Sequence, residues 1–438
     1  MSGFFIGRES VGQYVRYIAP SMFAFTISSI YGIVDGLFVG NVVGDAGLAA
    51  ISVGWPIVQL ALAVGTGIGM GGSVIASIHE GEGNHAESLR AMGTTLTMLV
   101  ACAIPLMLLI LLVGPWLMGP MGAQGETLVQ ARIYISAVAW GIPFYVIVMG
   151  ALPIVRNRGA VRTAMLIAVV AGFVNVVLDY VFVIVLRWGT AGAAWATVIG
   201  QGFGFLWVLA YFLKRNNREV LRHLKPVLAI AGHALVLGVA PCGLSILPEI
   251  TVVVTNINAC AVGGEPAVAA YAVISYVAII VQMMIQGVGD GSQPLISRFC
   301  GAGDYDAVKR IRRTNYAVTF ALGVLGFALM VLFRYQIPQA FGASDDTVHI
   351  IAHALPIFSL SYLVYAFTHP STSFFYAIDN SRASNIMVYG EAVCVVVLIT
   401  ALAHFFGLDG IWASAVTTQL CLLCIALVNI RSTDKRLS

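Results

Sequence analysis

A single carboxylate stands in the first long apolar stretch of this sequence, Pro20 to Gly40 (PSMFAFTISSIYGIVDGLFVG). It belongs to Asp35, and aromatic, aliphatic and small residues surround it without a nearby Lys or Arg. A carboxylate inside hydrocarbon is costly unless it is protonated, binds a cation or faces water. The sequence therefore predicts that Asp35 binds a proton or a metal cation.

A second group of polar residues follows in the stretch AGFVNVVLD. Asn175 and Asp179 are four residues apart, so they lie on one face of a helix. If Asp35 and Asp179 share a desolvated site, their carboxylates repel each other, which favours proton uptake by one of them. With Thr197, the same oxygens can instead surround a hard cation such as sodium. The alternative is that these residues are separate packing or interfacial groups.

Six of the 20 acidic residues fall within or beside long apolar stretches. Two of these are Asp35 and Asp179, and the other four are Glu249, Asp290, Asp379 and Glu391. Glu249 follows Pro248 and either acts in function or accepts a hydrogen bond between helices. Asp290 has a gating or a solvated role. Asp379 lies in the segment YAIDNSR, which favours a structural turn. Glu391 lines a cavity or pairs with another polar group.

Histidine, aromatic and thioether side chains extend this set. His369 directly precedes Pro370, where the backbone is already broken, and histidine can titrate near neutral pH. Met283 and Tyr365 belong to stretches rich in adaptable side chains, which suit varied apolar ligands. Each of these residues also fits an ordinary packing role.

Long apolar segments must position all these residues. The chain of 438 residues is 59% hydrophobic and 10% charged, with a mean hydropathy of +0.91, as in a polytopic membrane protein. A helix of about 20 residues crosses the hydrocarbon core. Segments of that length recur at 12–38, 47–78, 90–118, 128–152, 161–184, 190–213, 229–259, 266–298, 313–335, 347–377, 384–406 and 410–430. We expect an all-α membrane protein with twelve transmembrane helices.

Basic residues indicate the orientation of these helices. Of the 23 Lys and Arg residues, 20 lie in the terminal segments or in alternate loops on one side, and the other side has Arg132, Arg187 and Arg334. Because Lys and Arg concentrate in cytoplasmic loops, we expect both termini in the cytoplasm. We therefore expect the protein to lie in an inner membrane, where it contacts membrane lipids.

The two halves of the chain repeat. When the second half is aligned with the first, Gly81-Glu82-Gly83 falls on Gly301-Ala302-Gly303, and Gly189 and Gln201 fall on Gly407 and Gln419. The repeat predicts two pseudo-symmetric lobes of six helices each. We expect an N-lobe over 1–215, a basic cytoplasmic linker over 216–225 and a C-lobe over 226–438. Two such bundles are typical of transporters that bind substrate near the midplane.

Several other classes of protein are disfavoured. The seven cysteines lie mostly within apolar segments and predict neither a disulfide framework nor a zinc site. No G-x-S-x-G, H-E-x-x-H or phosphate-binding G-K-[ST] motif is present. We expect no enzyme, no cofactor and no nucleic-acid partner. The N-terminal sequence MSGFFIGRES also lacks the pattern of a cleaved signal peptide.

The chain resembles the multidrug and toxic compound extrusion (MATE) transporters over nearly its whole length. The resemblance rests on Pro20 and Asp35, LAAISVGWPI, Arg156 to Gly159, NVVLDYVFV, GTAGAAWATVIGQ and QPLISRFCGAGDYDAVKRI. It implies twelve helices, export of bulky amphipathic and often cationic compounds, and antiport against protons or sodium.

The resemblance also implies roles for individual residues. The family's N-lobe cation site falls on Asp35, Asn157, Asn175, Asp179 and Thr197, and sodium coupling would use Asp35, Asp179 and Asn175 as ligands. Tyr31 matches a residue one turn before Asp35, and Pro20 matches the hinge of helix 1 in some members. Glu249 corresponds to a C-lobe acid of some members. Around Thr368 and His369 this sequence lacks the acid that those members carry, which favours the N-lobe for coupling.

Taken together, the sequence predicts an antiporter driven by protons or sodium that exports small amphipathic cations by alternating access. We expect one chain to act as a monomer. A possible substrate-binding set in the C-lobe comprises Glu249, Met283, His369, Tyr365 and Glu391, with Tyr31 from helix 1. Two alternatives stay open, namely a flippase of lipid-linked saccharides from the same broad superfamily and a channel.

Overall fold

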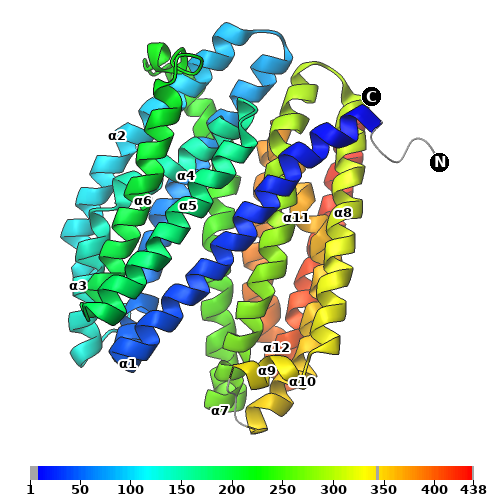
Figure 1. Cartoon of the computed structure of the whole chain (residues 1–438). Helices are drawn as coiled ribbons and strands as arrows, with labels where there is room; N and C mark the ends of the chain where they lie inside the picture. The colour runs from blue at the N-terminus through cyan, green and yellow to red at the C-terminus, as the bar shows by residue number, and fades with distance from the viewer. Residues whose placement is uncertain (1–7, 342–344, 437–438) are drawn as a thin grey trace. The chain divides into compact units, whose positions relative to one another are not determined.

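The computed structural model describes residues 8–341 and 345–436, without the side chains of 8–11, 31–37, 39–41, 43, 45, 346 and 436. These residues form helices joined by short turns, and the described part contains no strand (Figure 1). The helices are α1 (Arg8–Gly81), α2 (His85–Leu117), α3 (Gly125–Ala139), α4 (Ile142–Asn157), α5 (Val161–Asp179), α6 (Gly189–Leu213), α7 (Leu228–Gly301), α8 (Tyr305–Leu332), α9 (Gln336–Ala340), α10 (Asp345–Ser359), α11 (Ser361–Ala377) and α12 (Ser381–Arg436). A π-helix (Tyr180–Val185) follows α5, and a 3₁₀ helix (Val220–His223) follows α6.

Three of the longest helices are each broken at one glycine. Non-helical backbone interrupts α1 at Gly44, α7 at Gly264 and α12 at Gly407. Conversely, α3 and α4 form one bent apolar span, and α10 and α11 form another, with bends of 57° and 43°. When each broken helix is counted as two spans and each bent pair as one, the described helices correspond to the twelve spans predicted from the sequence.

The backbone repeats along the chain in the same alignment as the sequence. Gly44 has φ 74° and ψ −162°, and its equivalent in the second half, Gly264, has φ 65° and ψ −157°. Gly189 and Gly407, which the alignment also pairs, both have φ 61°. Residues with a Cβ rarely adopt such positive φ angles, so glycine is required where each break occurs. The internal repeat is therefore structural.

The turns after α1 and α7 are also built alike. Gly83 has φ 78° and Gly303 has φ 71°. The following residues cap the next helix, because Asn84 accepts a hydrogen bond from the Glu87 amide and Asp304 accepts one from the Ala307 amide. Such caps satisfy amides that have no partner inside the helix. Different residue types thus perform the same local task in the two copies.

Packing divides the chain into two compact units, Met1–Thr26 with Leu247–Ser438 (unit 1) and Ile27–Ile246 (unit 2). Each unit includes the first segment of the other repeat copy. In unit 2, a side chain on Gly67 would collide with Gly238 of α7. In unit 1, a side chain on Gly287, the equivalent of Gly67 in the repeat, would collide with Met22 of α1. The lobe boundary at 216–225 follows the repeat and stays a prediction.

Within unit 1, the first turns of α1 and the last turns of α12 pack against the same region of α8. The Tyr14 hydroxyl donates to Asn315 Oδ1 over 2.8 Å. One turn earlier on α8, Arg312 makes a bidentate ion pair with Asp434 of α12 at 2.8 and 2.9 Å. The start of α1 and the end of α12 thus lie at one end of unit 1 (Figure 1).

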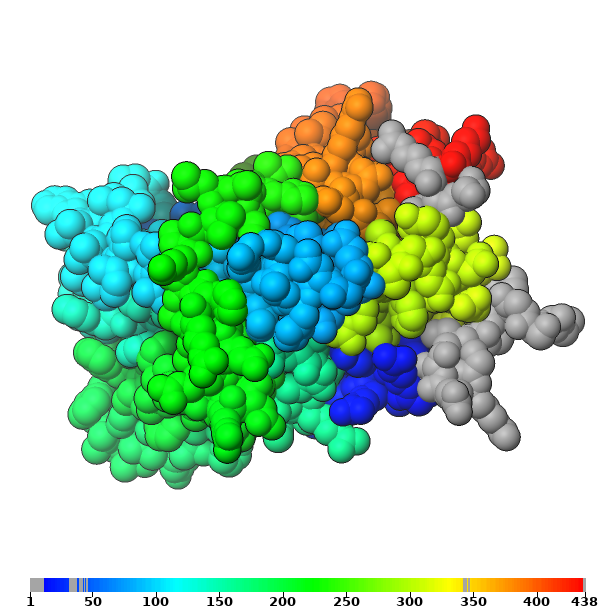
Figure 2. Space-filling view, turned by 90° about the horizontal axis from the view of Figure 1, so that it is seen from above, coloured from blue at the N-terminus to red at the C-terminus, as the bar shows by residue number. Residues whose placement is uncertain are grey.

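Within unit 2, the segment after α6 lies beside the start of α2. His85 Nε2 is 4.0 Å from Glu219 Oε2, and the Thr94 hydroxyl donates to the Lys225 carbonyl over 3.5 Å. Figure 2 shows this end of the unit, with the segment after α6 in green next to the turn between α1 and α2 in blue. The segment that connects α6 to α7 is therefore held against the start of α2 within unit 2.

Candidate functional site

Asp179 is the last residue of α5, and its side chain is entirely buried. A π-helix begins at the next residue and ends with the Leu186 amide bound to the Val181 carbonyl over 2.8 Å. Such widened turns are rare and frequently occur at functional sites. The buried carboxylate therefore lies where the regular helix geometry changes.

Asn175 lies one turn before Asp179 and reaches the neighbouring helix. Its Nδ2 donates to the Thr197 hydroxyl of α6 over 3.4 Å, and that hydroxyl donates to the Ala193 carbonyl over 3.1 Å. A side chain on Gly200 would meet the Ala171 carbonyl oxygen at 2.8 Å, so α5 and α6 approach closely here. The structure thus brings Asn175 and Thr197 into contact, with Asp179 one turn after Asn175 on the same helix.

A cavity of about 10 Å³ lies beside Thr197 in the same unit. Its lining residues are Val58, Val138, Gly141, Ile142, Tyr145, Thr197, Val198 and Gln201. Gln201 is 7% exposed, and its buried Oε1 has no hydrogen-bond partner in the described part of the chain. A cavity of this size can hold about one water molecule or an ion of similar size. The repeat in the sequence aligns Gln201 with Gln419, but no sequence pattern indicates that Gln201 lines this cavity.

The remaining residues predicted for the N-lobe lie on α4 and α1. Asn157 lies at the end of α4, and its Nδ2 donates to the Ser73 carbonyl and hydroxyl of α1 over 2.5 and 2.6 Å. Tyr31 and Asp35 are in α1, but their side chains lie outside the described part of the chain. The predicted hinge, Pro20, is half-buried in α1 within unit 1.

Unit 1 contains a second buried carboxylate, Asp290 of α7, which is 5% exposed. Its Oδ1 accepts a hydrogen bond of 2.5 Å from the Tyr376 hydroxyl of α11, and its Oδ2 accepts one of 3.4 Å from Gln286. Asp290 also interacts electrostatically with Tyr365 and His369. The carboxylate therefore belongs to a buried polar cluster rather than to a solvated surface.

His369 and Tyr365 form the centre of this cluster on α11. The Tyr365 hydroxyl is 3.0 Å from His369 Nδ1, as their spacing of four residues allows. His369 is 4% exposed, and no described residue forms a hydrogen bond with its buried Nε2. A side chain on Gly289 would lie 3.6 Å from His369 Cδ2, so this edge of the ring faces α7 next to Asp290.

Glu391 joins the cluster through a chain of hydrogen bonds from α11 to α12. The Thr368 hydroxyl donates to Gln419 Oε1 over 2.5 Å, and Gln419 Nε2 donates to Glu391 Oε1 over 2.7 Å. The alternative that Glu391 pairs with another polar group is thus the observed one. Sequence analysis did not identify Tyr376 and Gln419 as the partners of the two carboxylates.

Three further predicted residues lie elsewhere. Glu249 and Met283 are half-buried on α7 in unit 1. Asp379 has φ 61° in the turn after α11, which fits its predicted role in a structural turn. Among the described residues, no group of three or more His, Cys, Asp and Glu side chains could hold a metal ion. A sodium site would therefore need amide and hydroxyl oxygens besides carboxylates.

Known proteins resemble this chain throughout its length. A sequence model of the family described as MatE matches residues 20–181 and 241–409. The probable multidrug resistance protein YoeA of Bacillus subtilis (strain 168) is 25% identical over 362 residues, which cover 80% of this chain and 77% of YoeA. The multidrug export protein MepA of Staphylococcus aureus (strain MSSA476) is 23% identical over 421 residues, which cover 94% of this chain and 92% of MepA.

A solved structure shares the fold. It is the outward-facing conformation of a multidrug resistance MATE family transporter of the MOP superfamily, with a TM-score of 0.91 and 22% sequence identity. The match covers 97% of this chain and 96% of that one. This likeness confirms the predicted all-α fold of twelve helices in two six-helix lobes.

Proposed function

The chain belongs to the MatE family, and we propose that it exports amphipathic, often cationic compounds in exchange for protons or sodium ions. Family membership makes it a membrane transporter and not an enzyme. The substrate class is supported by the names of its relatives, which describe multidrug resistance and multidrug export proteins. The proposed coupling depends on the residues of unit 2.

One observation carries the proposal, namely the buried carboxylate of Asp179 beside a polar pair. Asp179 is entirely buried, and Asn175, one turn earlier, donates to Thr197. A buried charge is expensive unless it is neutralised or compensated. Binding of a cation supplies that neutralisation and thereby changes the free energy of the conformation that buries the site.

Alternating access follows from this dependence on charge. In the proposed cycle, a proton or sodium ion enters from outside and neutralises Asp35 and Asp179. Once neutral, the carboxylates no longer favour a conformation in which water reaches them. Helix α1 then repacks or bends at Pro20, and the exported compound leaves. Because the ion and the compound stabilise different states, each lowers the affinity for the other by the same factor.

The identity of the ion depends on which oxygen atoms converge. A proton needs only one of the two carboxylates. Sodium requires several oxygen ligands, for which Asp35, Asp179, Asn175 and Thr197 are the candidates. No further cofactor is part of the proposal.

We assign the second polar cluster to recognition of the exported compound. Asp290 and Glu391 supply negative charge, and Tyr365 and His369 supply rings that can stack on a flat cation. Met283 and Glu249 of the same unit complete the proposed set. Methionine suits varied ligands because its side chain is flexible and polarisable.

The proposed setting is the inner membrane of a bacterium, with both termini in the cytoplasm and one chain as the working unit. The distribution of Lys and Arg supports this orientation. The start of α1 and the end of α12 pack on one region of α8, as an even number of spans requires.

Gradient-driven efflux from proteoliposomes tests the proposal. Ethidium is the probe, and a pH gradient or a sodium gradient is imposed separately on wild type, Asp35→Asn and Asp179→Asn. We expect one gradient to drive efflux by wild type, and each variant to lose most of that efflux while still binding ethidium.

Glu126→Gln is the matched control, because Glu126 is an exposed carboxylate in the first turn of α3. It removes the same charge outside the proposed site and should retain wild-type efflux. Efflux by Asp179→Asn at the wild-type rate would contradict the proposed coupling. Transport of a lipid-linked saccharide without gradient-driven efflux of ethidium would favour a flippase instead.

A further inference from the structure

Unit 2 has a surface cavity of about 470 Å³ at the end where α4 and α6 both terminate. Two segments line it, namely the turn between α4 and α5 and the last turn of α6 with the residues after it. The lining residues are Arg158, Gly159, Ala160, Tyr211, Lys214, Arg215, Asn216 and Asn217. The volume is within the range of about 300–1,000 Å³ that is typical of small-molecule sites.

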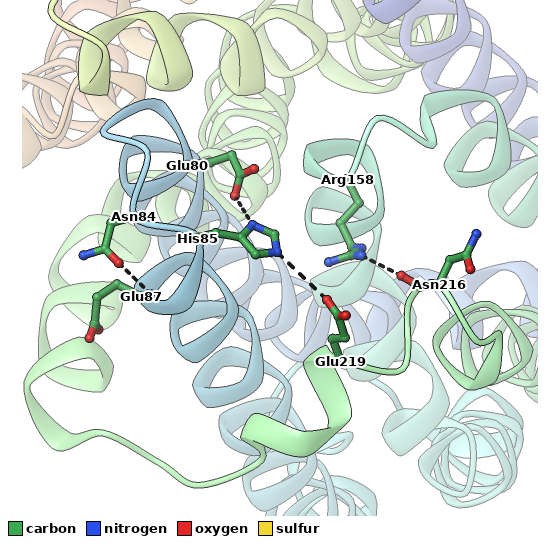
Figure 3. A network of polar contacts seen from close by, with 7 residues as sticks. All are labelled: Glu80, Asn84, His85, Glu87, Arg158, Asn216 and Glu219. Atoms are coloured by element: carbon green, nitrogen blue, oxygen red, sulfur yellow. Dashed lines mark hydrogen bonds and ion pairs between the residues drawn. The ribbon is translucent and has the colours of Figure 1, made fainter.

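The lining of this cavity carries positive charge without compensation. It includes Arg158, Lys214 and Arg215, and it includes no Asp or Glu. Within residues 8–341 and 345–436, the side chains of Lys214 and Arg215 form no ion pair or hydrogen bond. The acid in the same loop, Glu219, faces His85 of α2 at 4.0 Å instead (Figure 3).

Arg158 is held in place at the wall of the cavity. Its Nη2 donates to the Asn216 carbonyl over 3.0 Å, which links the turn after α4 to the loop after α6 (Figure 3). Arg158 also interacts electrostatically with Tyr211, whereas its buried Nε has no hydrogen-bond partner among the described residues. A planar guanidinium fixed in this way is suited to two parallel hydrogen bonds with a phosphate.

The loop that carries the other two cations is folded rather than extended. The Lys214 carbonyl accepts hydrogen bonds from the Asn217 and Arg218 amides at 2.9 and 3.0 Å. Asn217 Nδ2 donates to the Tyr211 carbonyl over 3.0 Å. This turn keeps Lys214 and Arg215 at the cavity in spite of their mutual repulsion with Arg158.

The start of α5 adds to the positive potential. The helix begins at Val161, and its N-cap residue Ala160, which lines the cavity, provides no side-chain cap. The N-terminal amides of a helix without a side-chain cap favour a nearby anion. The helix end and the three cations therefore act on the same space.

We propose that this cavity binds a phosphate-bearing anion, either the headgroup of an anionic lipid or free phosphate. Basic pockets between membrane helices are known to receive phosphorylated lipid headgroups. The bound anion offsets part of the charge of the three cations and joins the turn after α4 to the loop after α6. The site is independent of the proposed transport activity.

Binding to the purified full-length chain in detergent tests the site. The probes are inorganic phosphate and short-chain phosphatidylglycerol, with the zwitterionic short-chain phosphatidylcholine as the reference without net charge, at constant ionic strength. The test variant is Lys214→Gln with Arg215→Gln, which leaves the Arg158 contacts intact. The matched control is Arg222→Gln with Lys225→Gln, which removes the same charge from the same segment outside the cavity.

We expect wild type and control to bind at least one anionic probe with dissociation constants within twofold of each other. The test variant should bind at least tenfold more weakly, with an unchanged melting temperature when no probe is present. Binding of phosphatidylglycerol alone assigns the site to a headgroup, and binding of both probes assigns it to phosphate itself. Equal losses in both double variants, or no binding of either anionic probe by wild type, would overturn the proposal.

Discussion

At the scale of single residues, the proposed coupling site depends on a few short-range contacts between α5 and α6. The hydrogen bond from Asn175 to Thr197 orients the amide one turn before the buried Asp179. The hydroxyl also donates to the Ala193 carbonyl, so its position is fixed by its own helix. A substitution that keeps the volume of the Thr197 side chain but lacks its hydroxyl can therefore test that hydroxyl alone.

We predict that Thr197→Val weakens the coupling without abolishing it. Valine keeps the shape of the side chain but leaves the buried Asn175 amide without its acceptor, at a cost of about 1–3 kcal/mol. The concentration of coupling ion for half-maximal ethidium efflux should rise about tenfold, which corresponds to about 1.4 kcal/mol. Thr400→Val is the control, because the exposed Thr400 donates only within its own helix. If the ion dependence of efflux were unchanged in Thr197→Val, the hydroxyl would not be part of the coupling site.

A second prediction concerns the buried cluster of unit 1. Tyr376→Phe removes a donor from the buried Asp290 carboxylate and should destabilise the protein by about 1–3 kcal/mol. A lower melting temperature in detergent would show this loss. Tyr276→Phe is the matched control, because Tyr276 is 44% exposed and its ring stacks on Phe341. Equal melting temperatures for the two variants would show that the hydrogen bond does not stabilise the cluster.

The sequence was sufficient to predict some of these residues and insufficient for others. The spacing of Asn175 and Asp179 predicted a shared helix face, and Asp179 is buried there. The partners Tyr376 and Gln419 lie far along the chain from the carboxylates that they bind, so no local pattern could reveal them. The side chain of Asp35 lies outside the described residues, so its role stays a prediction.

At the scale of helices, glycines determine both the breaks and the close contacts. Gly264 interrupts α7 with a φ of 65°, and Gly44 interrupts α1 in the equivalent way. Elsewhere, Gly67 and Gly287 allow backbone contact between helices that a Cβ would prevent. The same residue type thus serves two purposes at different positions.

We predict that Gly264→Ala lowers the melting temperature clearly more than Gly232→Ala. Alanine at Gly264 must adopt a φ of 65° with a ψ of −157°, a region almost restricted to glycine, at a cost of about 1–3 kcal/mol. Gly232 is in regular helix near the start of α7 and has open space around it, so alanine is compatible there. Thermal unfolding of both variants in the same detergent measures the difference. A smaller effect at Gly264 would mean that the break in α7 is not needed for stability.

The repeat was predictable from the sequence, but the packing units were not. Matching glycines in the two halves predicted two equivalent copies, and the backbone angles at Gly44 and Gly264 agree. However, the first segment of each copy packs with the rest of the other copy, as the contact of Gly287 with Met22 shows. Apolar periodicity identifies which helix face is buried but not which helix covers it.

At the scale of the whole molecule, the proposed transport cycle couples a buried charge to the binding of an exported compound. Family membership accounts for the twelve-helix fold and for a transporter. The proposal adds that an ion at the N-lobe carboxylates and a cationic compound cannot both be bound tightly. This competition is an equilibrium property and can be measured without a membrane gradient.

The affinity of the purified protein for ethidium, measured against pH and against sodium concentration, tests this competition directly. If one proton competes, the dissociation constant of wild type should rise about tenfold for each unit by which the pH falls, within the pH range where the site is protonated in the absence of ethidium. If sodium competes, it should rise in proportion to sodium concentration above the ion's own dissociation constant. Asp179→Asn should lose most of this dependence. A wild-type affinity that responds to neither ion would contradict the proposed coupling.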